Sequence, residues 1–143
     1  MHLVRLSGAA MALWAIAAIP VHANESGVIA ATEAWAAAFN SREPARVTAT
    51  YVPDAILWGT TSKALVTSPG GVADYFKDLP NRALRVKFDS HHVQLLGEAA
   101  TNAGLYTFTD TATGGSLVAR YSMVFARRDG RWVLVHHHSS RVP

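Results

Sequence analysis

Apolar positions follow a helical spacing near the start of the chain and an alternating spacing toward its end. The first set, Val28, Thr32, Trp35 and Phe39, recurs every three or four residues. Such spacing places the side chains on one side of a helix. We therefore expect an amphipathic helix from Glu25 to Asn40.

Shorter elements are predicted before the alternating region. Pro44 should open a second helix that reaches Tyr51, because proline is tolerated at the first helical position. Asp54 to Trp58 is typical of a short strand. Ser68-Pro69 indicates the start of a third helix, which Pro80 should stop. The buried face of this helix is expected to hold Val72, Tyr75, Phe76 and Leu79.

The second half of the chain predicts four longer strands, over 83–95, 99–110, 116–127 and 132–139. Their turns are marked by Gly97-Glu98, Thr113-Gly114-Gly115 and Asp129-Gly130. Helices that precede an antiparallel meander predict an α+β fold. We expect one domain, residues 24–143, with the N-terminal helices packed on a curved, cone-shaped antiparallel sheet.

Asp129-Gly130 lies between two β-prone apolar runs and predicts a two-residue hairpin turn. Strict pairing from this turn joins Arg128 to Arg131, Phe125 to Leu134, Met123 to His136 and Tyr121 to His138. Side chains alternate along strands. One face should therefore carry Tyr121, Met123, Phe125, Trp132, Leu134, His136 and His138, which resembles the floor of a pocket.

The opposite face of the same strands is also apolar in sequence, with Val118, Val124, Val133 and Val135. An antiparallel sheet with one solvated face alternates cleanly between apolar and polar residues, and these strands do not. We therefore expect a second copy of the chain to cover this face, giving a homodimer.

Residues 1–23 have the pattern of a secretory signal. Arg5 precedes an apolar run from Ala9 to Val21, and Val21-His22-Ala23 supplies small residues at the positions that signal peptidase reads. The run is shorter than the roughly 20 residues that span a bilayer. We expect cleavage after Ala23, export to the periplasm, and no stable membrane insertion of the mature chain.

The composition narrows the chemistry further. The chain has no cysteine, which excludes disulfides and thiolate chemistry. Its formal net charge is +3 at pH 7 and its basic residues are scattered, so no nucleic-acid partner is expected.

Two histidines and one aspartate are the candidate chemical groups. His136 and His138 are spaced to offer two nitrogens to a metal, but no third ligand can be placed with them, so no metal and no cofactor is expected. Neighbouring hydroxyls could instead satisfy the imidazoles, or one imidazole could act as a general base. Asp54 is the one carboxylate that could face a cavity, although Pro53-Asp54 is also typical of a turn.

Several segments together resemble a known family. They are Arg127-Arg-Asp-Gly-Arg-Trp132, Val135-His136, His138, Ser140, and Val93-Gln-Leu-Leu-Gly-Glu-Ala-Ala100 with Tyr106 beyond it. They resemble the association (hub) domain of calcium/calmodulin-dependent protein kinase II, a member of the nuclear-transport-factor-2-like superfamily. Bacterial SgcJ/EcaC-like (SnoaL-like) relatives are also similar, through Leu57-Trp-Gly-Thr60 with Ser62, Ala119-Arg-Tyr-Ser122 and His137-His-Ser-Ser140.

The resemblance implies a cone with a ligand-sized cavity, and dimers that assemble further. Hub cavities carry arginines that favour acidic ligands. Here the aligned positions hold Met123 and Ser139, with Arg120 nearby on the opposite face unless a bulge re-aims it. No kinase activity is expected from a chain of 143 residues.

Taken together, the sequence predicts a self-associating domain that binds a small, mostly apolar or aromatic molecule in its cone without catalysis. The predicted ligand-binding residues are Trp58, Tyr106, Arg120, Tyr121, His136, His138 and Ser139. The alternative is a cofactor-independent isomerase, cyclase or hydrolase that uses His136 or Asp54 as its general base.

Overall fold

The structure is a computed structural model that describes residues 24–68 and 70–143. The predicted signal segment, residues 1–23, and Pro69 lie outside the described residues. Within the described part of the chain, no helix combines the length and the hydropathy needed to cross a membrane.

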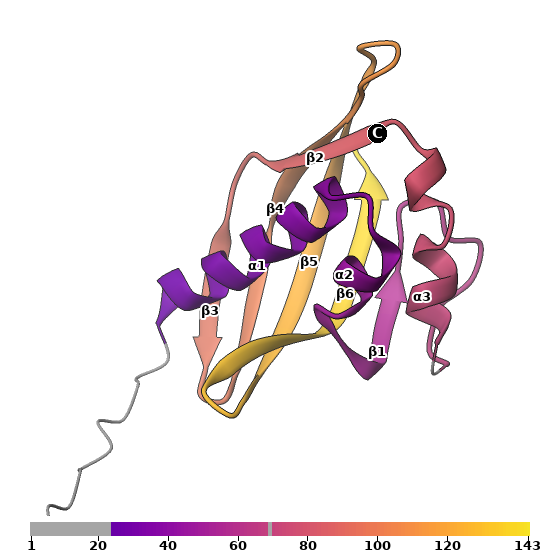
Figure 1. Ribbon diagram of the computed structural model, residues 1–143. Coiled ribbons are helices and arrows are strands. Elements are labelled where there is room, and N and C mark those ends of the chain that lie inside the picture. The colour runs from indigo at the N-terminus through magenta and orange to yellow at the C-terminus, as the bar shows by residue number, and fades with distance from the viewer. Residues whose placement is uncertain (1–23, 69) are drawn as a thin grey trace, which may run out of the picture.

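The first helix, α1, spans Glu25–Asn40, as its apolar spacing predicts. Asn24 caps it, because its side-chain oxygen accepts a hydrogen bond from Gly27 N at 2.8 Å. Trp35 and Phe39 are buried on the side that faces the sheet. Figure 1 shows α1 lying diagonally across one face of the sheet.

Three shorter helices follow at the side of the sheet. Helix α2 spans Pro44–Thr48 and is shorter than expected, because strand β1 already begins at Tyr51 and runs over Tyr51–Trp58. Helix α3 spans Gly71–Phe76 and a 3₁₀ turn, η1, spans Leu79–Asn81. The predicted start of α3 at Ser68-Pro69 is too early: its N-cap is Gly70, in the left-handed region at φ 82°.

The remaining strands are β2 (Leu84–Phe88), β3 (His92–Leu96), β4 (Ala99–Asp110), β5 (Ser116–Arg128) and β6 (Arg131–Arg141). The single strand predicted over 83–95 is broken into β2 and β3, which both pair with β4. Asp89 N and Ser90 N both donate to Leu105 O, so two residues oppose one. Gly104 permits this bend, since a Cβ there would lie 2.3 Å from Ser90 O.

The six strands form one sheet in the order β1-β6-β5-β4-β2, with β3 also on β4. β1 is parallel to β6, and every other pair is antiparallel. The predicted α+β fold is confirmed, with a mixed rather than purely antiparallel sheet. The helices lie on one side of the sheet, which we call the concave face; the other side, the convex face, carries no helix (Figure 1).

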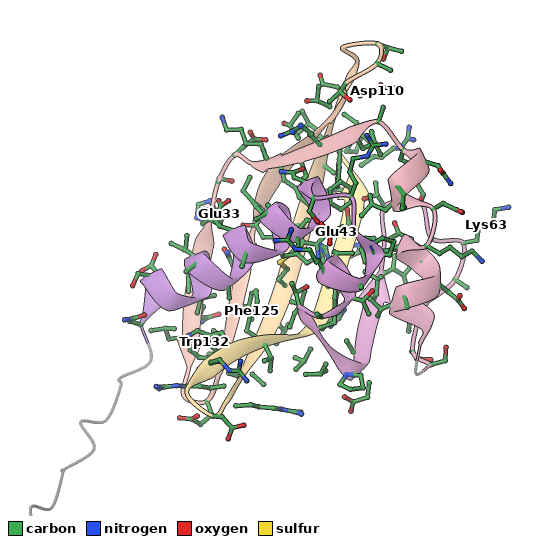
Figure 2. The ribbon with its side chains drawn as sticks, viewed as in Figure 1. Glu33, Glu43, Lys63, Asp110, Phe125 and Trp132 are labelled. Atoms are coloured by element: carbon green, nitrogen blue, oxygen red, sulfur yellow. The ribbon has the colours of Figure 1, made fainter. Side chains whose placement is uncertain are left out.

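The core lies between α1 and the concave face. Trp35 is its centre: its ring contacts those of Phe39, Phe88 and Tyr106 at centroid distances of 5.5, 6.0 and 6.2 Å. At the other end of α1, the Trp132 indole packs against Gly27 in the first turn (Figure 2). The second half of α1 thus places the buried Trp35 indole beside the part of the sheet that the helix does not cover.

Candidate functional site

The β5–β6 hairpin turns where the sequence predicts it. Asp129 and Gly130 have φ values of 51° and 74°, the positive values that a two-residue hairpin turn requires. Arg128 pairs with Arg131, and Phe125 with Leu134, which confirms the predicted register for the first part of the hairpin.

One extra residue in β6 then shifts the pairing. Phe125 pairs with Leu134, but its neighbour Val124 pairs with His136, so Val135 has no partner across the ladder. This is a β-bulge, and beyond it the two strands are offset by one residue. The predicted pairs of Met123 with His136 and Tyr121 with His138 are therefore wrong: Met123 pairs with His137, and Tyr121 with Ser139.

A shift of one residue exchanges the two faces of a strand. His137 and Ser139 point to the concave face and are 2% and 4% exposed. His136 and His138 belong to the convex face, where they lie opposite Ile56 and Trp58 of β1. The bulge therefore brings a different imidazole to the interior from the two that strict alternation predicts.

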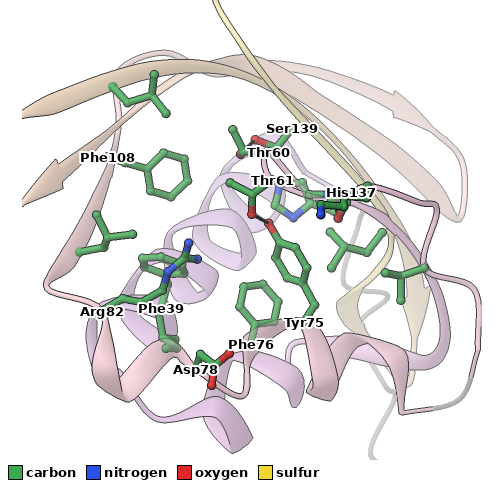
Figure 3. Close-up of a pocket in the computed structure, with 18 of the residues that line it drawn as sticks. Phe39, Thr60, Thr61, Tyr75, Phe76, Asp78, Arg82, Phe108, His137 and Ser139 are labelled. Carbon is green, nitrogen blue, oxygen red and sulfur yellow. Dashed lines mark hydrogen bonds between the residues drawn. The ribbon is translucent and has the colours of Figure 1, made fainter.

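A cavity of about 1040 Å³ opens on the concave face beside α1. Aromatic side chains form much of its wall, including Phe39, Phe76 and Phe108, while polar groups gather at one side, where Thr60, His137 and Ser139 meet (Figure 3). Arg82 and Asp78, from the segment around η1, lie at the opposite side. Lys63, Asp74, Asp110 and Arg141 complete the charged part of the lining.

The loop after β1 contributes one wall because it contains a glycine. A Cβ at Gly59 would lie 2.2 Å from the Tyr75 ring, so glycine allows the tyrosine of α3 to pack directly on the backbone. Tyr75 is half-buried and its hydroxyl meets that of Thr61 at 3.4 Å. Tyr75, expected in the buried face of α3, packs against the core and also lines the cavity.

His137 is held by a chain of buried hydrogen bonds. Trp35 Nε1 donates to Tyr51 Oη at 2.8 Å, and Tyr51 Oη lies 2.8 Å from His137 Nδ1. On the other side of the ring, His137 Nε2 lies 3.4 Å from Tyr106 Oη. Burial, together with the neighbouring His136 and His138, lowers the pKa of His137 to about 3. The imidazole is therefore neutral at physiological pH.

The two tyrosines of this hydrogen-bond chain, Tyr51 and Tyr106, are neutral as well. Burial raises the pKa of Tyr51 well above its usual value. Burial also raises the pKa of Tyr106, against the opposing effect of the Ser139 and Thr60 hydroxyls that bond to it. Those two hydroxyls are also hydrogen-bonded to each other. The polar side of the cavity is thus a set of uncharged donors and acceptors.

Of the predicted ligand-binding residues, Tyr106 and Ser139 line the cavity. Tyr121 is buried but lies elsewhere: its hydroxyl donates to Ser90 O at 2.8 Å and also contacts His91 and Asn102. There it ties the β2–β3 bend to the sheet, and His91 in turn reaches Glu33 of α1 at 3.0 Å.

The other predicted residues lie outside the cavity. Trp58 is 42% exposed and, like His136 and His138, belongs to the convex face. Arg120 is exposed and donates to Ser140 Oγ and Arg141 O. Asp54 is exposed on β1. Sequence reasoning missed His137, because no residue type marks the bulge that turns it inward. It also missed Tyr51 and Thr60, which come from β1 and the loop after it and meet β6 only in the fold.

The convex face carries the apolar residues that no helix covers. Ile56, Trp58, Leu105 and Val118 are each 38–42% exposed, and Val124 of β5 is half-buried. Val133 and Val135, also expected on this face, are half-buried and pack against the core. Among residues 24–68 and 70–143, no group of three or more His, Asp or Glu side chains is arranged to hold a metal.

Comparison with known proteins gives a consistent result. The family model of the calcium/calmodulin dependent protein kinase II association domain matches residues 24–143. A crystal structure from Xanthomonas campestris, of a protein proposed to be such a domain, is 33% identical and has a TM-score of 0.77; the match covers 94% of this chain and 99% of that one.

Two more distant structures share the fold. The CaMKII hub homology domain of Chlamydomonas reinhardtii is 20% identical over 82% of this chain and 97% of its own, with a TM-score of 0.68. A nuclear transport factor 2-like protein from Salmonella enterica is 16% identical over 82% and 90%, with a TM-score of 0.69. No match was found among curated proteins.

Proposed function

The chain belongs to the calcium/calmodulin-dependent protein kinase II association-domain family, within the nuclear-transport-factor-2-like superfamily, and from this premise we propose a non-catalytic domain with two binding faces. Its concave face binds a small, mostly apolar or aromatic molecule. Its convex face binds a second copy of the chain.

The cavity supports the ligand proposal. Its volume of about 1040 Å³ is at the upper end of the range of pockets that enclose small molecules. Aromatic walls with a few converging polar groups at one side are the usual composition of such pockets. Phe39, Phe76 and Phe108 would contact the apolar body of a ligand, and Thr60 and Ser139 would contact its polar group.

The protonation of His137 favours binding over catalysis. A general base needs a free lone pair that faces the substrate. Trp35 Nε1 donates to Tyr51 Oη, so the Tyr51 proton is directed to the lone pair of His137 Nδ1, and Nε2 of the neutral ring then carries the proton. His136 and Asp54, the general bases predicted for the alternative isomerase, cyclase or hydrolase, lie outside the cavity.

The exposed apolar residues of the convex face support self-association. Contiguous apolar surface on a soluble protein usually marks a contact site. Trp58 and Ile56 on β1, and Leu105 and Val118 on β4 and β5, place exposed apolar side chains on both sides of β6. The family is also one of hub-like domains, which can oligomerise.

Sedimentation velocity tests the convex face. We expect a dimer or a larger assembly for the wild type, and a monomer for a Trp58→Arg/Val118→Asp variant with an unchanged circular dichroism spectrum. Leu65→Arg is the matched control, because Leu65 is 44% exposed but lies on a loop. A monomeric wild type, or a double variant that assembles normally, would contradict the proposal.

Native mass spectrometry of the protein purified from its own host tests the cavity. We expect an additional small mass on each subunit, lost in Leu117→Trp, which places an indole in the cavity. Leu96→Trp, on the exposed edge strand β3, should retain it. A wild type without any bound mass, or equal retention by both variants, would contradict the ligand proposal.

We also propose that the chain is exported and cleaved after Ala23. The basic start, the apolar run and the small residues before Asn24 support this, and Asn24 is the residue that caps α1. N-terminal sequencing of protein from the periplasmic fraction should begin at Asn24. Full-length protein found in the cytoplasm would contradict export.

A further inference from the structure

The buried hydrogen-bond chain of the cavity has a direction. An indole N–H can donate but cannot accept. Trp35 Nε1 therefore donates to Tyr51 Oη, and the proton of Tyr51 has no acceptor other than His137 Nδ1 among the hydrogen bonds of the described residues. Trp35, Tyr51 and His137 are each at most 7% exposed, so water is not available to reverse this order.

The direction continues through the imidazole. Because Nδ1 accepts, the neutral ring carries its proton on Nε2, which points to Tyr106 Oη at 3.4 Å. Tyr106 is 1% exposed, and apart from His137 its hydrogen-bonding neighbours are the hydroxyls of Ser139 and Thr60. The proton of Tyr106 is therefore directed to this pair.

The Thr60 and Ser139 hydroxyls carry two protons between them, and neither proton is used toward Tyr106, which donates to the pair. One of their own protons lies in the bond between Thr60 and Ser139. The other has no acceptor among the hydrogen bonds of the described residues, and both hydroxyls line the cavity. We infer that this end of the cavity is a hydrogen-bond donor, and that the ligand presents to it an acceptor oxygen of the neutral carbonyl type.

This inference deepens the proposed ligand function and rests on it. An ammonium group could use only the lone pairs of these hydroxyls, which would leave the remaining hydroxyl proton without an acceptor. A carboxylate would find an O–H but no cation among the four residues Thr60, Ser139, Tyr106 and His137. A ketone, aldehyde or ester on an aromatic or aliphatic body fits both the donor and the apolar wall.

Three probes of similar shape test the inference by NMR titration: acetophenone, isopropylbenzene and 1-phenylethylammonium. Replacing Thr60 and Ser139 by Val and Ala should weaken acetophenone binding about fivefold to tenfold, the value of one hydrogen bond. Isopropylbenzene should bind the variant at least as well as the wild type, and the ammonium should bind most weakly to the wild type. The matched control is Thr101→Val on β4, which removes a hydroxyl outside the cavity lining and should change none of these affinities.

Each outcome decides between specific claims. Equal weakening of acetophenone and isopropylbenzene, or no weakening of either, would overturn the donor assignment while leaving the apolar cavity as a binding site. Preferred binding of the ammonium would show that the hydrogen-bond chain runs in the opposite direction, and it would also overturn the donor assignment. Failure of all three probes to bind, together with no retained mass in native mass spectrometry, would overturn the proposed ligand function itself. If the double variant does not fold, Thr60→Val alone provides the same comparison.

Discussion

His137 and His138 are consecutive residues of β6, yet they belong to different environments. His137 is 2% exposed, with its ring 5.0 Å from that of Trp35 and its Nδ1 bonded to Tyr51. His138 is exposed on the convex face, paired with Trp58 across the parallel β1–β6 ladder. The difference shows that the single extra residue Val135, rather than the composition of the strand, decides which imidazole serves the cavity.

The same contrast extends to the two faces of the sheet. The concave face holds neutral polar groups that are shielded from water and bonded in a fixed order. The convex face holds exposed apolar groups beside Arg120, His136 and His138, with no helix over them (Figure 1). A substitution on the concave face should therefore act on folding and ligand binding, and one on the convex face should act on assembly.

The largest expected difference in stability is between alanine substitutions of two tryptophans, one on each face. Trp35→Ala removes the centre of the aromatic core and the first donor of the buried chain, and should lower the free energy of unfolding by about 3–5 kcal/mol. Trp58→Ala should change it by less than about 1 kcal/mol when measured at a concentration where the chain is monomeric. Urea denaturation of both variants provides the values, and similar losses would remove the distinction between the faces.

A second difference concerns pH. The pKa of His137 is about 3 in the folded state and about 6.5 when unfolded, so the unfolded chain binds the additional proton between these values. Stability must then fall as pH decreases below about 6.5, and the contribution of His137 amounts to about 2 kcal/mol between pH 7 and pH 5.

Urea denaturation at pH 7 and pH 5 isolates this contribution by comparing variants. His137→Phe should reduce the loss of stability between the two pH values by about 2 kcal/mol. His138→Phe, the matched control on the exposed side of the strand, should leave the effect of the buried imidazole in place. An unchanged pH dependence in His137→Phe would place the ring in contact with water.

The smallest expected effect affects both faces equally. Gly130 has φ 74° in the hairpin turn, and nothing lies within 4 Å of the position where a Cβ would be. Gly130→Ala should therefore cost about 1 kcal/mol through backbone strain alone. Thermal unfolding should show this loss without a change in oligomeric state. A change in assembly would indicate that the turn belongs to an interface.

Much of the fold could be predicted because it depends on local patterns. The spacing of Val28, Trp35 and Phe39 predicts α1 with its observed bounds, and Asp129-Gly130 predicts the hairpin turn. Turn residues between alternating runs likewise predict β4 and β5 to within one residue. The parallel pairing of β1 with β6 could not be predicted, since it joins residues far apart in sequence.

The candidate site could be predicted only in part. Tyr106 and Ser139 were expected at the ligand and line the cavity, whereas His136 and His138 were assigned to it through a register that the bulge at Val135 alters. A bulge of this kind has no requirement for glycine or proline, and Val135 is an ordinary strand residue. The position of Thr60 depends in addition on Gly59. The need for glycine there becomes clear only from the packing of the Tyr75 ring against its backbone.

The chemistry of the cavity depends most on His137 being a neutral, buried member of its wall. Two-dimensional ¹H–¹⁵N NMR of the histidine rings between pH 4 and pH 8 tests this directly, with His137→Phe used to assign its signals. We predict a pyridine-like Nδ1 and a protonated, pyrrole-like Nε2 for His137 throughout this range. A His137 ring that becomes charged near pH 6.5, or one that carries its proton on Nδ1, would contradict the account.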